Sequence, residues 1–120
     1  MTRPATYGVA MDQIERLLRR LALNDETSVE MVLVRGSGAE SGATLVPKVD
    51  LLVRLGALLA LGAATTSLRA AVQSAKLAGA TDGEIVGVLI AVAPAVGQAR
   101  VVSTAPKLAS AIGYELEEDE

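Results

Sequence analysis

Four charged side chains lie within otherwise apolar stretches, and these are the residues that could carry chemistry: Asp50, Arg54, Glu84 and Arg100. Asp50 and Arg54 are four residues apart, a spacing that brings an acid and a base together on one helix face. The pair is either a structural ion pair or part of a binding site, in which Arg54 or Arg100 holds a carboxylate through two hydrogen bonds. In the second interpretation, Asp50 and Glu84 are the candidate catalytic acid–base residues, and Arg54 and Arg100 are the candidate ligand-binding residues.

Glu84 and Arg100 also have structural interpretations. Thr81 precedes Glu84 by three residues, which is the pattern of a capping box at the beginning of a helix. Arg100 is the only charged residue from Ile85 through Pro106, and an unpaired buried guanidinium is very costly. Arg100 must therefore reach an acid, a carbonyl group, solvent or a ligand, and we expect first an ion pair across a subunit interface.

The composition excludes several classes of chemistry. The 120 residues include no cysteine and no histidine, which rules out disulfides, thiol redox chemistry, Cys/His zinc sites and any catalytic triad that uses histidine. We therefore predict no metal site and no cofactor. The N-terminal residues lack the apolar core of a signal peptide, so a cytoplasmic location is expected.

Charge is unevenly distributed along the chain. The net charge is -3, and residues 115–120 form an acidic tail with five carboxylates. No basic cluster is interleaved with aromatic side chains, so a nucleic-acid partner is not predicted.

The stretch Leu51–Leu61, LLVRLGALLAL, is apolar around its whole circumference apart from Arg54. A helix of this kind is buried in a protein core or in a membrane, and this one is too short for a bilayer, which needs about 20 apolar residues. We therefore predict the central helix of a bundle and no membrane span. Pro47 suits the first turn of this helix, and Gly62 its end.

The remaining elements are also expected to be helical. Asp12 is predicted to cap the first helix after an irregular lead over residues 1–11, and Asn24 or Asp25 to cap the second through Val34, although a short strand over 29–34 fits nearly as well. A loop rich in turn formers, residues 36–44, separates this pair from the rest and is predicted to be flexible. The later helices are predicted at 66–78 (stopping at Gly79), 85–93 (bent or broken at Pro94) and 95–112 (interrupted or kinked near Pro106).

Self-association is expected from the composition. The core must be built from Ala, Val, Leu and Ile, because Phe and Trp are absent. Small side chains bury little area, and each Å² of buried apolar area contributes only about 25 cal/mol of stability. A small domain of this kind commonly gains stability by oligomerisation. The interface is predicted to use mainly the two all-apolar helices, at 47–61 and 85–93.

Residues 45–112 resemble the carboxymuconolactone decarboxylase family, which includes the alkyl hydroperoxidase D proteins. The most specific part of the resemblance is the run AGATDGEI, from Ala78 to Ile85, followed by an apolar helix and APAVG. The resemblance implies one all-α domain over residues 1–120, an alkyl hydroperoxidase D-like helical bundle that assembles as a trimer or hexamer.

The resemblance does not extend to the redox chemistry of that family. Its redox members carry a CxxC motif followed by His, with a Glu one helix earlier. The corresponding residues here are Ala64 and Ser67 for the cysteines, Ala71 for the histidine and Asp50 for the glutamate. A thiol peroxidase is therefore excluded. The decarboxylase members are also expected to use a histidine where Ala71 stands, and Val46 replaces a capping Asp that is frequent in related sequences.

Two classes of function remain open. The first is a carboxymuconolactone decarboxylase-like homo-oligomer without thiol redox chemistry, which binds a small carboxylate or apolar ligand or serves in assembly. The alternative is a non-redox enzyme, of decarboxylase or lactone-isomerising type, acting on a small carboxylated substrate through its Arg and Asp/Glu residues. Convergence of Asp50, Arg54 and Arg100 on one cavity would favour the enzyme, and pairing among them would favour a structural role.

Overall fold

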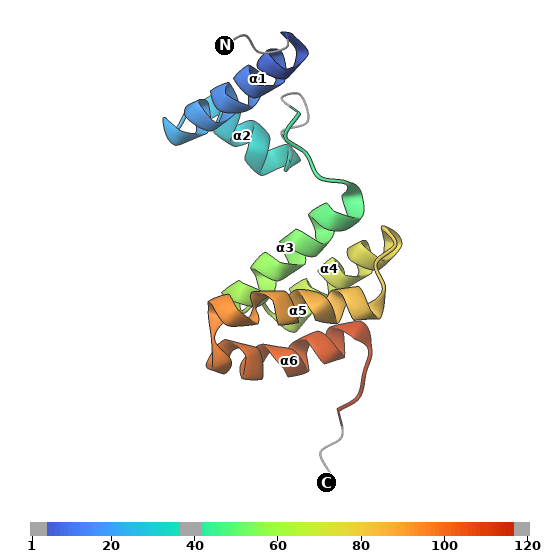
Figure 1. Ribbon diagram of the computed structural model, residues 1–120. Coiled ribbons are helices and arrows are strands. Elements are labelled where there is room, and N and C mark those ends of the chain that lie inside the picture. Colours follow the sequence, from blue (N-terminus) through green and yellow to red (C-terminus); the bar gives the residue numbers. More distant parts are fainter. Residues whose placement is uncertain (1–4, 37–41, 117–120) are drawn as a thin grey trace. The chain divides into compact units, whose positions relative to one another are not determined.

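The computed structural model describes residues 5–36 and 42–116, and the all-α prediction is confirmed for these ranges (Figure 1). The helices are α1 (Ala5–Ala22), α2 (Glu26–Arg35), α3 (Pro47–Leu61), α4 (Thr65–Leu77), α5 (Asp82–Val96) and α6 (Gln98–Ile112).

The chain divides into two compact units, Met1–Leu45 and Val46–Glu120. Their boundary adjoins the predicted loop at 36–44, of which residues 37–41 lie outside the described part of the chain, as do residues 117–120 of the acidic tail. The expectation of a single domain over residues 1–120 stays a prediction.

The first unit contains α1 and α2. Because α1 already begins at Ala5, the predicted irregular lead is wrong for residues 5–11, and Asp12 lies inside the helix rather than at its cap. After Pro4 the sequence has no helix breaker stronger than Gly8, which costs only about 1 kcal/mol relative to Ala.

The turn between α1 and α2 is held by local side-chain contacts. Asp25 caps α2, since its Oδ2 accepts a hydrogen bond from the Ser28 N–H at 3.0 Å, so the helical prediction is confirmed over the short strand. The Arg20 Nε donates to the buried Ser28 Oγ at 3.0 Å and ties α1 to α2.

The second unit is a bundle of four helices, in which α3 and α6 each contact both α4 and α5. These contacts place the helices at the corners of a square, with α3 diagonal to α6. Each helix contributes large aliphatic side chains to a common core, which includes Leu55, Leu59, Leu68, Val72, Ile85, Leu89 and Leu108.

The predicted ends of α3 are confirmed. Pro47 occupies its first turn, and Gly62 ends it in the left-handed conformation, with φ 73°. Val46 is the N-cap residue and makes no side-chain hydrogen bond to the helix. The first turn of α3 therefore lacks the acceptor that an Asp at this position would supply.

The sequence predicted that the helix over 85–93 is bent or broken at Pro94, and the break is wrong. The α5 helix continues through Pro94 to Val96, and Gly97, with φ 89° and ψ 168°, separates it from α6. Near the end of a helix a proline removes a single hydrogen bond, whereas the backbone conformation of Gly97 is one that residues with a Cβ rarely adopt. Pro106 likewise does not interrupt α6, which continues to Ile112.

Candidate functional site

Asp50 and Arg54 form the predicted ion pair within α3, with 3.1 Å between Arg54 Nη2 and Asp50 Oδ2. Both side chains are partly open to solvent, at 51% exposure for Arg54 and 33% for Asp50. The Arg54 guanidinium is therefore not buried in the core of the bundle. An exposed pair of this kind adds about 0.2–1 kcal/mol to stability.

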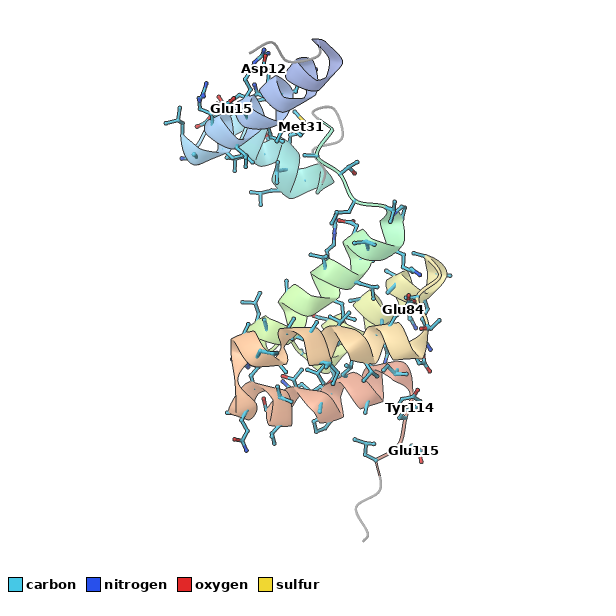
Figure 2. The ribbon with its side chains drawn as sticks, viewed as in Figure 1. Asp12, Glu15, Met31, Glu84, Tyr114 and Glu115 are labelled. Atoms are coloured by element: carbon cyan, nitrogen blue, oxygen red, sulfur yellow. The ribbon has the colours of Figure 1, made fainter. Side chains whose placement is uncertain are left out.

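Glu84 forms the predicted capping box at the beginning of α5. Its Oε1 accepts from the Thr81 N–H at 2.9 Å, its own N–H donates to Thr81 Oγ1 at 3.0 Å, and its Oε2 accepts from Lys48 Nζ at 3.0 Å. Figure 2 labels Glu84. Both acceptor bonds favour the ionised carboxylate and hold the pKa of Glu84 below its usual range. The hydrogen bond from the Thr81 N–H has the larger effect, and that from Lys48 comes next. A carboxylate held in this form is poorly suited to act as a general acid near neutral pH.

Arg100 is exposed, so solvent is one of the expected partners that it does reach. Its guanidinium lies over Gly62, so closely that a Cβ at Gly62 would collide with Arg100 Nη1. Within the described ranges, no carboxylate forms a salt bridge with Arg100. A cation at this place interacts favourably with the partial negative charge at the end of α3.

The four predicted site residues do not converge on one cavity. The guanidinium of Arg100, a residue of α6, lies at the end of α3, whereas Asp50 lies in the first turn of α3. Asp50 and Gly62 are 12 positions apart in the sequence, which corresponds to about 18 Å along a helix. Glu84 is paired with Lys48 and does not line either of the grooves described below.

A groove of about 380 Å³ lies between α3 and α4, and both polar and apolar residues line it. It is lined from α3 by Leu51, Arg54 and Leu58, and from α4 by Ser67, Ala70, Ala71 and Ser74. We refer to it as the Arg54 groove.

The Arg54 groove has the chemistry of an anion site with apolar walls. The guanidinium of Arg54 offers planar N–H donors, and the hydroxyls of Ser67 and Ser74 can donate as well. Ser67 also lies in the first turn of α4, whose N-cap residue, Ala64, makes no side-chain hydrogen bond. The N–H groups at the beginning of a helix favour negative charge.

Sequence reasoning selected Arg54 but not the two serines as ligand-binding residues. Ser67 and Ser74 are seven residues apart in α4, which places them on one face two turns apart. This spacing in the sequence could have indicated that the two serines share a helix face. It does not show which neighbouring helix that face contacts.

A second groove, of about 480 Å³, lies between α3 and α5 and has no charged or hydroxyl-bearing side chain in its lining. It is lined from α3 by Val49, Leu52, Val53, Gly56, Ala57 and Ala60, and from α5 by Val88, Ala91 and Val92. We refer to it as the apolar groove.

Asp82 is the centre of another polar cluster, and it lines neither groove. It accepts from Lys76 Nζ at 2.8 Å and from the Tyr114 hydroxyl at 2.8 Å, which ties the beginning of α5 to α4 and to the segment after α6 (Figure 2). The hydrogen bond from Lys76, and then that from Tyr114, lower the pKa of Asp82, and the Asp82 carboxylate raises the pKa of Tyr114.

Two further features are not found in the described ranges. No group of three or more acidic side chains there is placed so that it could hold a metal ion. Each helix in these ranges is too short or too polar to span a bilayer.

Comparison with models of protein families, with curated proteins and with solved structures finds no match to this chain. The resemblance to the carboxymuconolactone decarboxylase family therefore remains a prediction from the sequence.

Proposed function

We propose that the Val46–Glu120 unit is a carboxymuconolactone decarboxylase-like module without thiol chemistry, which binds a small carboxylate with an apolar body in the Arg54 groove. One observation carries the proposal: Arg54, Ser67 and Ser74 line a groove whose other lining residues are aliphatic. A few polar groups that orient a ligand against apolar walls are typical of small-molecule sites.

The dimensions of the groove suit a small ligand. Its volume of about 380 Å³ is near the lower limit of about 300–1,000 Å³ that is usual for such sites. A carboxylate of the size of benzoate would place its charge on Arg54 and its ring against Leu51, Leu58 and Ala71. Its carboxylate would compete with Asp50 for the guanidinium, which favours ligands that also reach Ser67 or Ser74.

The family resemblance supports the same location. Ser67 and Ala71, which correspond to a cysteine and the histidine of the redox members, both line the Arg54 groove. On this proposal the chain keeps the pocket and has replaced the reactive groups by small side chains. Binding rather than turnover then accounts for the absence of cysteine and histidine.

The alternative, a non-redox enzyme, has less support. Neither Asp50 nor Glu84 lines the Arg54 groove, and each carboxylate is engaged in an ion pair. A general acid–base residue must come within hydrogen-bond reach of the reacting atom. Glu84 does not line this groove, and Asp50 adjoins it only through its ion pair with Arg54.

Binding can be tested by thermal shift and calorimetry with benzoate, and with benzamide as the uncharged control. At ten times its Kd, benzoate should stabilise the protein by about 1.4 kcal/mol. Arg54→Gln should weaken benzoate binding about 10- to 100-fold, because it removes charge-assisted hydrogen bonds worth about 1.5–3 kcal/mol.

Arg100→Gln is the matched control, since Arg100 was the other predicted ligand-binding residue and does not line the groove. It should leave benzoate binding unchanged. Equal shifts with benzoate and benzamide, or benzoate binding that survives Arg54→Gln, would contradict the proposal.

A further inference from the structure

A carboxylate adjoins the Arg54 groove, beside the guanidinium that would hold the ligand. Asp50 lies one turn before Arg54 on α3, and its Oδ2 is 3.1 Å from Arg54 Nη2. Asp50 does not line the groove itself, but it directly precedes Leu51, which does. Both charged side chains are partly exposed, so a ligand that enters from solvent meets a negative and a positive group next to each other.

A ligand whose only charge is a carboxylate is disfavoured by this arrangement. To bind Arg54, it must compete with the Asp50 carboxylate for the same guanidinium. Its own negative charge then lies close to that of Asp50, and like charges at such a distance repel each other. Asp50 loses part of its attraction to Arg54 and gains no other cation in exchange.

A ligand that carries an ammonium group beside its carboxylate avoids both costs. We infer that the Arg54 groove binds an α-amino acid with an apolar side chain. Its carboxylate pairs with Arg54, its ammonium group pairs with Asp50, and its side chain lies against Leu51, Leu58 and Ala71. The inference rests on the proposed function and narrows the ligand class from small carboxylates to zwitterions.

The short distance between the two charges favours an α-amino acid over longer amino acids. Asp50 and Arg54 are already in contact, so the ligand that displaces them least is one whose own charges are close together. In an α-amino acid a single carbon atom separates the nitrogen from the carboxylate group. Because the Asp50 side chain is partly exposed, a bound ammonium group also keeps part of its hydration, which limits the cost of desolvation.

The rest of the groove favours an uncharged side chain on the ligand. Among the described residues that line it, Arg54 alone is charged, and Ala70 and Ala71 leave space beside Leu51 and Leu58. A second carboxylate or ammonium group on the ligand would lie against these aliphatic side chains without a partner, which is unfavourable. Leucine and phenylalanine are the kind of amino acid that this lining suits.

Calorimetry on the full chain with three ligands of one carbon skeleton tests the inference. L-Phenylalanine carries both charges, 3-phenylpropionate lacks the ammonium group, and 2-phenylethylamine lacks the carboxylate. Phenylalanine should bind about 3- to 30-fold more tightly than 3-phenylpropionate, because it gains one partly exposed ion pair and avoids one repulsion of similar size. The amine should bind more weakly than phenylalanine, since Arg54 repels it.

Asp50→Asn keeps the shape of the side chain and removes its charge. The preference for phenylalanine over 3-phenylpropionate should disappear in this variant, with weaker binding of phenylalanine and equal or tighter binding of 3-phenylpropionate. Asp82→Asn is the matched control, because Asp82 is also a partly exposed carboxylate in an ion pair, with Lys76, and lines neither groove. It should keep the wild-type preference, and circular dichroism should show that both variants remain helical.

The ligand series separates failure of this inference from failure of the proposed function. Equal affinities of the wild-type chain for phenylalanine and 3-phenylpropionate, or a preference that survives Asp50→Asn, would overturn the inference. The proposed function would still stand if Arg54→Gln weakened the binding of 3-phenylpropionate. Absence of binding by all three ligands and by benzoate would overturn both.

Discussion

Thr104→Val should make the protein more stable. Thr104 faces the core of the bundle from α6 with 1% of its surface exposed, and within the described residues its hydroxyl has no hydrogen-bond partner. A buried polar group left unsatisfied costs about 1–3 kcal/mol. Valine has nearly the same shape and places a methyl group where the hydroxyl was. We therefore expect a gain of about 1–2 kcal/mol in the free energy of unfolding.

The matched variant is Thr104→Ser, which keeps the hydroxyl and removes the methyl group. Loss of one buried methyl group should cost about 1 kcal/mol. The expected order of stability is therefore Val, then Thr, then Ser at position 104.

Urea denaturation followed by circular dichroism measures these differences, and thermal unfolding provides a second reading. For a unit of this size, 1 kcal/mol corresponds to a change in Tm of about 4–8 °C. A valine variant no more stable than the wild type would refute the reasoning, because it would mean that the hydroxyl makes a stabilising contact in solution.

Three further predictions concern charge and capping. Val46→Asp should stabilise the chain by about 1 kcal/mol in urea denaturation, because it supplies the missing N-cap acceptor of α3; Val46→Ala, the control, should be neutral, and an equal effect of both would contradict this. The pKa of Asp82 is lowered chiefly by its hydrogen bond from Lys76, so its contribution is complete above the unfolded-state pKa of about 3.9 and is lost as the pH falls through the lower folded-state pKa. The stability difference between wild type and Asp82→Asn should accordingly shrink below about pH 4, and a difference unchanged down to pH 2 would argue against this linkage. Arg100→Met should cost no more than about 1 kcal/mol, the value of a cation at a helix end, and a loss of about 3–5 kcal/mol would instead indicate a buried ion pair.

The helices and their caps could be predicted because their signals are local. Pro47 and Gly62 mark the ends of α3, and the capping box of Thr81 and Glu84 begins α5. Each of these features depends on residues within one helical turn, whose separation in space follows from their separation in sequence. The pairing of Asp50 with Arg54 was predictable for the same reason.

Local reasoning failed where two signals competed. Pro94 and Gly97 are both residues that commonly end a helix, and the prediction rested only on the proline. The end of α5 is set by how far α5 packs against its neighbours in the bundle. The turn to α6 then needs the backbone conformation of Gly97, which residues with a Cβ rarely adopt. Nothing in the immediate sequence of Pro94 reports where α5 stops contacting α6.

By itself, the sequence determined an all-α chain without thiol or imidazole chemistry, since both follow from composition and from the period of the apolar residues. Only the tertiary structure decided that Arg100 lies at the end of α3, that Ser67 and Ser74 face the groove beside Arg54, and that the groove of Val53 is exposed. Each of these facts depends on how helices pack side by side. Packing brings together residues distant in sequence, and the helical period within one segment does not specify which face meets which neighbour.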